Sequence, residues 1–182
     1  MKNLISLFFI LLISLPACNY KEKKTEKEAE LDIIKSTLIQ LNQDVPDFDF
    51  ITLNNDTINI HDLKGKVVFM NFFATSCPIC MKELPYIESE IWPKYKENDQ
   101  FELLVFGREH NAEQMIRFQE KSGYTFNIIP DPERRIYSLF AERYIPRNIV
   151  LNREGKIIYQ ATGFDDDEFS KLKEFIENEL NN

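Results

Sequence analysis

Cysteine and histidine are scarce in this chain, whose 182 residues include three cysteines and two histidines. Cys18, Cys77 and Cys80 are too few to build a disulfide-stapled scaffold, so the setting of each cysteine must indicate its role. Structural zinc prefers four ligands, and only His61 and His110, from separate segments, could join the cysteine pair. We therefore expect no metal site and no other cofactor.

Basic residues are also in deficit, with 22 Lys and Arg against 30 Asp and Glu and a formal net charge of −8. This balance gives no support to nucleic-acid binding, which requires a basic face. Hydrophobic residues make up 43% of the chain and aromatic residues 13%, which favours a packed core over disorder. The length suits one domain with short appendages, and the sequence shows no internal repeat and no second domain.

Long hydrophobic runs are limited to one, at the N-terminus. It extends from Leu4 to Leu15 behind Lys2, which is short for a membrane span and typical of an export signal. It ends in Leu15-Pro16-Ala17-Cys18, which resembles the lipobox of bacterial lipoproteins. The resemblance implies cleavage after residues 1–17 and lipid attachment to Cys18. An ordinary secretory signal with a leftover cysteine is the alternative, and either reading predicts export.

Residues 18–43 are predicted to form a charged tether. The run from Lys21 to Glu28 mixes both signs and has no apolar face, as expected of a solvated segment. Beyond it, a short helix leading into the fold is indicated by the helical spacing of Leu31, Ile34, Leu38 and Leu41. The folded domain is predicted to span residues 44–182.

The most informative stretch lies between a predicted strand and a predicted helix. Residues 67–73 are β-branched and aromatic, as in a buried strand. The following helix has one apolar face, formed by Leu84, Ile87, Ile91 and Tyr95. Cys77 and Cys80 lie at the junction, where free N–H groups and the positive end of the helix dipole favour a thiolate. The pattern predicts a redox-active dithiol.

Strands and helices alternate along the rest of the predicted domain. In chain order we expect a hairpin around residues 54–56, a strand over 101–106, a helix from Asn111 to Gly123, a short strand over 125–129, a helix over 133–142, a hairpin around 152–155 and a helix after Asp165. This order predicts an α/β fold with parallel pairings and antiparallel strands at one side. Pro85 predicts a kink just beyond the cysteines.

Residues 67–80 resemble the strand and active-site signature of the TlpA/ResA-like thiol–disulfide oxidoreductases of the thioredoxin superfamily. Pro46-Asp47-Phe48 resembles the start of that family's N-terminal hairpin, and residues 140–146 resemble its run into a cis-proline. The chain between Phe106 and Ile149 resembles its helix-bearing insert. The resemblance implies a thioredoxin-like α/β fold with an N-terminal β-hairpin and a central helix-bearing insert.

The site residues follow from position and from this resemblance. Cys77, nearest the helix start, is predicted to be the exposed nucleophile. Cys80 lies about one turn further in, roughly 4–5 Å along the helix, and is predicted to be the buried resolving thiol. The resemblance implies that Pro146 is cis and faces the cysteines, leaving the Ile145 backbone free to pair with a substrate peptide. An ordinary trans proline is the alternative.

A carboxylate lies close to the cysteines in the sequence. Glu83 follows Cys80 by three residues and shares its helix face, and the resemblance implies that it modulates proton transfer and thiol pKa. Asn71 stands where plain thioredoxins have a buried aspartate, which leaves Glu83 as the obvious carboxylate for this task. A surface glutamate is the alternative.

Two neighbours of the cysteines depart from the family pattern. Arg147 follows the predicted cis-proline, where the family usually has threonine, and Ser76 replaces the usual tryptophan. We hypothesise that Arg147 stabilises the Cys77 thiolate and contacts substrate, and that Ser76 opens the surface to a bulkier partner. The alternative for Arg147 is a side chain that faces solvent or pairs with a surface acid.

These patterns predict a lipid-anchored, periplasm-facing thiol–disulfide oxidoreductase of the cell envelope. Its partners would be protein thiols and disulfides, with no nucleic acid. The resemblance implies a reductase that a membrane protein re-reduces, for example in cytochrome c maturation. A peroxiredoxin-like peroxide reductase is one alternative, although Met70 and Ala74 break its Pro-x-x-x-Thr-x-x-Cys pattern. A copper- or thiol-binding protein is the other, with His110 as its only support beyond the cysteines.

Overall fold

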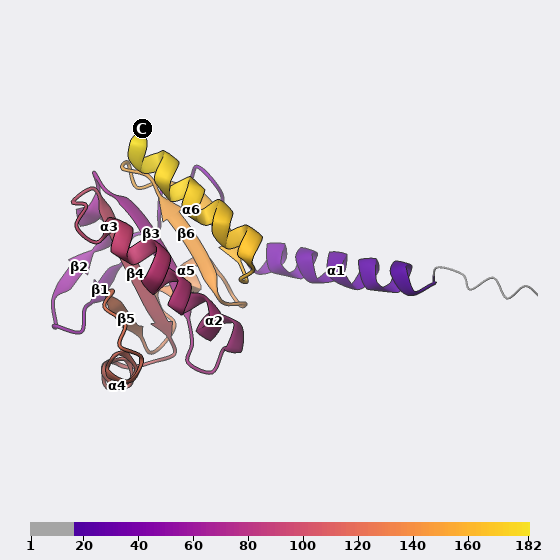
Figure 1. The fold of residues 1–182 in the computed structure, drawn as a ribbon, viewed down its shortest axis with the longest axis horizontal. Helices are drawn as coiled ribbons and strands as arrows, with labels where there is room; N and C mark the ends of the chain where they lie inside the picture. The colour runs from indigo at the N-terminus through magenta and orange to yellow at the C-terminus, as the bar shows by residue number, and fades with distance from the viewer. Residues whose placement is uncertain (1–16) are drawn as a thin grey trace, which may run out of the picture.

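The computed structural model describes residues 17–182, which form a mixed α/β domain with one long helix projecting from it (Figure 1). Most of the predicted signal peptide therefore lies outside the described residues. None of the helices in the described range is long and apolar enough to cross a membrane.

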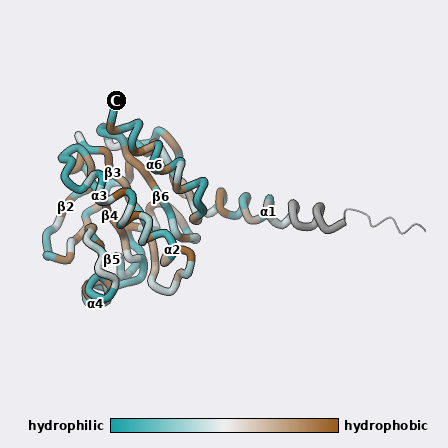
Figure 2. Tube along the Cα trace, viewed as in Figure 1, coloured by the Kyte–Doolittle hydropathy of each residue, from teal (hydrophilic) through white to brown (hydrophobic). Residues whose placement is uncertain are grey.

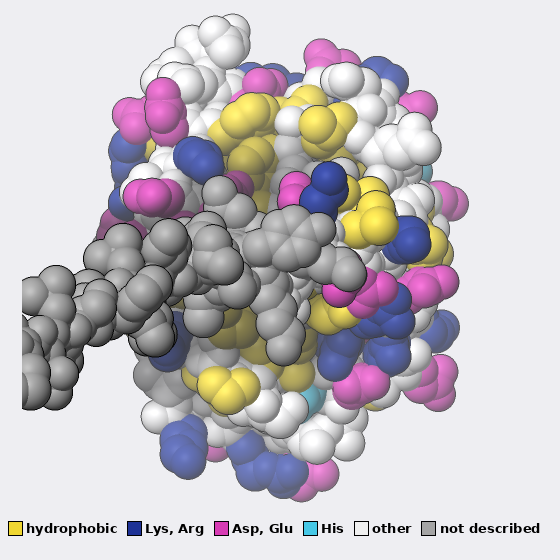
Figure 3. All heavy atoms as spheres, turned by 90° about the vertical axis from the view of Figure 1, so that its right-hand side faces the viewer, with side chains coloured by type: hydrophobic (Ala, Val, Ile, Leu, Met, Phe, Trp, Pro, Cys, Tyr) yellow, Lys and Arg dark blue, Asp and Glu magenta, His cyan; other side chains and the backbone are white. Residues whose placement is uncertain are grey.

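The projecting helix α1 (Ala17–Ser36) occupies most of the predicted tether. The predicted apolar stripe consists of Leu31, Ile34, Leu38 and Leu41, and α1 ends before the last two. All four side chains are about half exposed. The face from which α1 emerges also shows several hydrophobic side chains at the surface (Figure 3). The stripe is therefore not buried by the domain.

Residues 37–43, predicted as the end of the tether, run along the domain instead. Thr37 forms a β-bridge with Ala141, and the Asn42 N–H donates to the Ile157 carbonyl at 2.7 Å. Ile39 is only 4% exposed. The packed part of the chain thus begins at residue 37, before the predicted boundary at residue 44, because the domain buries Ile39 and bonds to the backbone of this segment.

The main sheet has five strands in the order β5-β4-β3-β6-β7. Their bounds are β3 (Val67–Phe73), β4 (Phe101–Arg108), β5 (Ile128–Asp131), β6 (Arg147–Leu151) and β7 (Ile157–Thr162). β3, β4 and β5 are parallel, whereas β6 runs antiparallel to β3 and to β7. The predicted combination of parallel pairings with antiparallel strands at one side is confirmed.

β3 is the central strand, and all seven of its residues are buried. Because side chains alternate across a strand, it contributes to two cores. One face packs against the hairpin of β1 (Asp49–Ile51) and β2 (Thr57–Asn59), the 3₁₀ turn Ile60–Leu63 and α5 (Tyr137–Phe140). The other face packs against α2 (Pro78–Tyr86) and α6 (Asp166–Asn181). The apolar strands run through the centre of the domain in Figure 2.

The predicted kink after the cysteines takes the form of a π-helical turn, Ile87–Ile91, between α2 and α3 (Trp92–Tyr95). Pro85 inside α2 has no N–H to donate, which is consistent with irregular helix just beyond it. The predicted apolar face of this segment is nonetheless buried throughout.

The insert between β4 and β6 contains α4 (Ala112–Ser122), capped by Asn111 and ended by Gly123 in the left-handed region as predicted. The helix predicted over residues 133–142 is shorter, because Arg134 adopts φ 57° and interrupts it. β4 continues through Gly107, where a Cβ would lie 2.2 Å from the Met115 sulfur. This glycine permits close packing of α4 and does not end the strand.

Candidate active site

Cys77 and Cys80 form a disulfide at the start of α2, with Cα atoms 5.3 Å apart. Cys77 is the N-cap residue, and its sulfur accepts the Cys80 N–H at 3.2 Å. Cys77 is partly exposed, whereas Cys80 is 0% exposed. The more accessible sulfur is thus the one that the helix terminus can stabilise as a thiolate.

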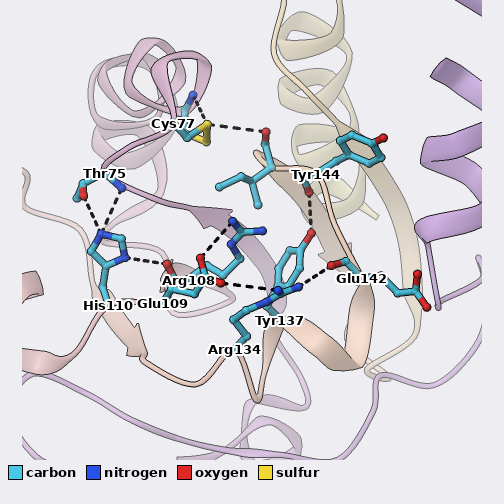
Figure 4. Close-up of polar contacts among 11 residues, drawn as sticks. Thr75, Cys77, Arg108, Glu109, His110, Arg134, Tyr137, Glu142 and Tyr144 are labelled. Carbon is cyan, nitrogen blue, oxygen red and sulfur yellow. Dashed lines mark hydrogen bonds and ion pairs between the residues drawn. A yellow bond between two sulfur atoms is a disulfide. The ribbon is translucent and has the colours of Figure 1, made fainter.

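The opposite wall of the site is the loop that precedes β6. Its Ile145–Pro146 peptide bond is cis, as the resemblance implied. The Ile145 carbonyl oxygen lies 3.8 Å from the Cys77 sulfur (Figure 4). Two hydrogen bonds from other residues hold this loop. The Tyr137 hydroxyl donates to the Tyr144 carbonyl at 2.8 Å, and the Arg134 guanidinium donates to the Glu142 carbonyl.

Glu83 is 0% exposed, which excludes the alternative of a surface glutamate. Its carboxylate accepts N–H bonds from the side chains of Asn71, at 2.8 Å, and Asn148. Burial raises the pKa of Glu83 to about 7, and the two amide donors partly oppose this shift. A carboxyl group with this pKa can exchange a proton near neutral pH.

Asn71 and Asn148 were not predicted as partners of Glu83. They are opposite each other in the antiparallel pairing of β3 and β6, and the Asn71 amide donates to the Asn148 side-chain oxygen at 2.7 Å. Both side chains are buried. Two asparagines in mostly apolar strands were the available signal, but the pairing register of the strands could not be read from the sequence.

Arg147 lies elsewhere than hypothesised. It is 3% exposed, and its guanidinium donates to the hydroxyls of Ser36 and Thr37 at 3.0 Å and to the carbonyls of Arg143 and Tyr144. Burial lowers its pKa. These contacts fasten the end of α1 to the cis-proline loop. They agree neither with a cation beside Cys77 nor with a solvent-facing or acid-paired arginine.

The remaining predicted residues have different surroundings. Ser76 is exposed beside Cys77, and its role stays a prediction. Cys18 falls within α1, but its side chain is not among those described. His110 contacts Thr75 in the turn before the cysteines. Within residues 17–182 no group of three His, Cys, Asp or Glu side chains is arranged to hold a metal ion.

Two cavities of about 500 Å³ lie away from the disulfide. One is between α1 and β7 and is lined in part by Arg147 and Gln160. The other is between the β1–β2 hairpin and β5. Neither cysteine lines either of these two cavities.

A model of the Redoxin family matches residues 40–176. The thiol–disulfide oxidoreductase ResA of Bacillus thuringiensis (strain Al Hakam) is 30% identical over 125 residues, which cover 69% of this chain and 71% of that protein. This chain belongs to the Redoxin family. It is a ResA-like thiol–disulfide oxidoreductase with a thioredoxin-like fold, so the predicted fold class and enzyme class are confirmed.

Other relatives of this Redoxin-family protein agree. ResA of Bacillus subtilis (strain 168) is 29% identical over 125 residues, covering 69% of each chain. The solution structure of a protein from Bacteroides thetaiotaomicron that has been proposed to be a protein disulfide isomerase superposes with a TM-score of 0.77 at 31% identity, covering 81% of this chain and 94% of that one. Thiol–disulfide exchange on protein substrates is therefore the activity that the site has to explain.

Proposed function

We propose that this protein reduces disulfides in other proteins through Cys77 and Cys80, as an enzyme of the cell envelope held to a membrane by a lipid on Cys18. The observation that carries the chemistry is the disulfide at the start of α2, with one accessible sulfur, one buried sulfur and a cis-proline loop facing them. Ser76 and Ile79 are exposed beside Cys77, as contact with a protein substrate requires.

The reaction runs in two exchanges. In the reduced enzyme the Cys77 thiolate attacks one sulfur of a substrate disulfide, which forms a mixed disulfide and releases the other substrate sulfur as a thiolate. Cys80 then loses its proton and attacks Cys77. This step forms the Cys77–Cys80 disulfide and releases the second substrate sulfur, so two electrons pass to the substrate.

The substrate segment is proposed to lie along the cis-proline loop. The Ile145 carbonyl is 3.8 Å from the Cys77 sulfur, so a peptide paired with this backbone would bring its own sulfur into range. Main-chain pairing of this kind binds extended peptides with little dependence on sequence. The exposed Ser76 and Ile79 flank the same sulfur and would contact the partner.

Glu83 is proposed to receive the proton of Cys80. It lies one turn further along α2, is buried with Cys80 and has a pKa raised to about 7. At neutral pH a large fraction of Glu83 is ionised and can accept a proton. α2 contains no other acidic residue. When a membrane-bound dithiol donor later reduces the Cys77–Cys80 disulfide, Glu83 would return the proton to Cys80.

The decisive experiment equilibrates the mature chain with a series of glutathione redox buffers and traps free thiols by alkylation. We expect a single two-electron transition that requires both Cys77 and Cys80, and a reduced Cys80→Ser variant that accumulates a mixed disulfide with a disulfide-containing substrate protein. The control is Cys18→Ser, which should leave the transition unchanged. Failure of the pair to form a reversible disulfide would reject the proposed reaction.

The anchor has its own test. Cells expressing the full chain would be labelled with a fatty acid, and the protein would be followed through membrane fractionation. We expect label and membrane association with Cys18 present and neither with Cys18→Ser. A secreted, unlabelled wild-type protein would leave the exchange chemistry standing and reject the lipid anchor.

A further inference from the structure

A histidine from outside α2 reaches the active-site turn. His110 leaves the end of β4 and contacts Thr75, two residues before Cys77 (Figure 4). Its Nε2 atom lies 2.7 Å from the Thr75 hydroxyl oxygen and 3.4 Å from the Thr75 backbone nitrogen. The sequence suggested His110 only as a metal ligand.

The hydrogen-bond partners define the state of the ring. The Nδ1 atom lies 2.7 Å from the Arg108 carbonyl oxygen, which can only accept a hydrogen bond, so Nδ1 carries the proton. In the neutral ring Nε2 is then an acceptor. It receives the hydroxyl hydrogen of Thr75, and the Thr75 backbone N–H points to the same atom.

The backbone is shaped to place the ring there. Glu109, just before the histidine, adopts φ 67°, a region that non-glycine residues rarely enter. Two backbone hydrogen bonds hold this turn. The Glu109 N–H donates to the Asp131 carbonyl at 2.8 Å, and the His110 N–H donates to the Gly107 carbonyl at 3.2 Å. The ring also stacks on Phe73, the last residue of β3, with centroids 6.5 Å apart.

We propose that His110 is a positioning residue for Cys77, whose neutral imidazole holds, through Thr75, the turn that presents the Cys77 sulfur at the start of α2. The proposal rests on the proposed exchange reaction. The turn also contains the Cys77 N–H bond to the Ala74 carbonyl at 3.0 Å, so a shift at Thr75 moves Cys77 with it.

The effect should differ between the two redox states. In the oxidised enzyme the disulfide itself fixes Cys77 to Cys80. In the reduced enzyme only hydrogen bonds keep the Cys77 sulfur on the Cys80 N–H, and a thiolate gains more from that bond than a disulfide sulfur does. Loss of the His110 contact therefore destabilises the reduced form more and shifts the equilibrium toward the disulfide.

The experiment measures the dithiol–disulfide equilibrium with glutathione and the alkylation rate of Cys77 at pH 7. For His110→Ala we expect a shift toward the disulfide of about threefold to tenfold, the range of one lost hydrogen bond, and a fall of similar size in alkylation rate. A tenfold shift corresponds to about 30 mV. Thr75→Val, which keeps the backbone N–H, should shift both readouts in the same direction by less.

His110→Gln supplies a neutral acceptor and should restore both readouts toward wild type. The matched control is His61→Ala, the other histidine, whose contact is with Asp47 near the N-terminal hairpin; it should behave as wild type. The proposal is overturned if His110→Ala matches wild type, or if His110→Gln shifts as far as His110→Ala. If His110→Ala does not fold, Thr75→Val decides, and a wild-type value there overturns the proposal.

This outcome is separable from that of the proposed function. If the wild-type pair does not exchange with glutathione, the exchange reaction fails before the variants are compared. If the wild-type pair exchanges and the variants do not differ, only the role of His110 fails.

Discussion

Two polar groups flank the disulfide, and they differ in burial. Beneath Cys80, Glu83 is sealed in the core with Asn71 and Asn148 as hydrogen-bond donors. Beside Cys77, His110 is only partly buried and contacts Thr75 at the surface. Glu83 accepts hydrogen bonds from two buried side chains, whereas the His110 ring contacts Thr75 and the Arg108 carbonyl.

The difference shows what burial adds to a hydrogen bond. The Glu83 carboxylate has lost its water, and two amide N–H groups replace only part of that hydration, so its pKa rises to about 7. A surface contact such as that of His110 acts mainly on geometry. We therefore expect changes at Glu83 to alter proton-linked properties strongly, and changes at His110 to alter the placement of one sulfur modestly.

The largest effect should come from the charge of Glu83. Its folded pKa of about 7 exceeds the ordinary value of 4.5, so between these pH values the folded state keeps a proton that the unfolded state releases. The contribution of Glu83 to stability is therefore highest below pH 4.5 and falls as pH rises through 7, by about 3 kcal/mol in all. Urea unfolding of the oxidised wild type and of Glu83→Gln, at several pH values, measures this slope.

Glu83→Gln should lack that decline, so the difference between the two proteins should grow as pH rises. The control is Glu97→Gln, which removes a carboxylate from the exposed surface and should keep the wild-type slope. A stability difference between wild type and Glu83→Gln that is constant from pH 4 to pH 8 would show that the carboxylate ionises as freely as one in water.

A smaller effect is expected at Asn148. Asn148→Ala removes one donor to Glu83 and the acceptor of the Asn71 amide, so the pKa of Glu83 should rise above 7. The buried groups left without partners should cost about 2 kcal/mol at pH 8, and less at pH 5, where Glu83 is protonated. The same truncation at the exposed Asn127 should change little. A loss that is equal at both pH values would separate Asn148 from the ionisation of Glu83.

Arg147 is a third polar residue, besides Glu83 and His110, whose effect on Cys77 can be tested. Because the guanidinium binds Ser36 and Thr37, Arg147→Thr should loosen α1 and cost about 1–2 kcal/mol of stability. The pKa of Cys77, measured by thiol titration, should stay at its wild-type value. A change in that pKa would support the original hypothesis that Arg147 stabilises the Cys77 thiolate.

Much of this fold could be predicted because local signals agreed with one another. The run of apolar residues in β3, the cap at Asn111 and the glycine at position 123 each define an element within a few residues of the chain. The disulfide site followed from Cys77 and Cys80 at one strand–helix junction. Such features depend on neighbours in sequence, which a single chain displays directly.

The remaining features depend on register and on contacts between distant segments. Asn71 meets Asn148 only because β6 pairs with β3 in one of several registers. Arg147 was expected near Cys77 because it follows Pro146, but its long side chain reaches the end of α1 instead. A flexible cation can point several ways, and the charge pattern of the sequence does not choose among them.

The attachment of α1 has a mechanical consequence. At 1.5 Å per residue, its 20 residues make an arm about 30 Å long, and that arm is fixed to the loop that carries Ile145. A small tilt at the fixed end becomes a wide swing at the far end, and a load on the far end acts as a torque on one wall of the active site. A force on the first turn of this helix would therefore reach the loop that faces Cys77 across the active site.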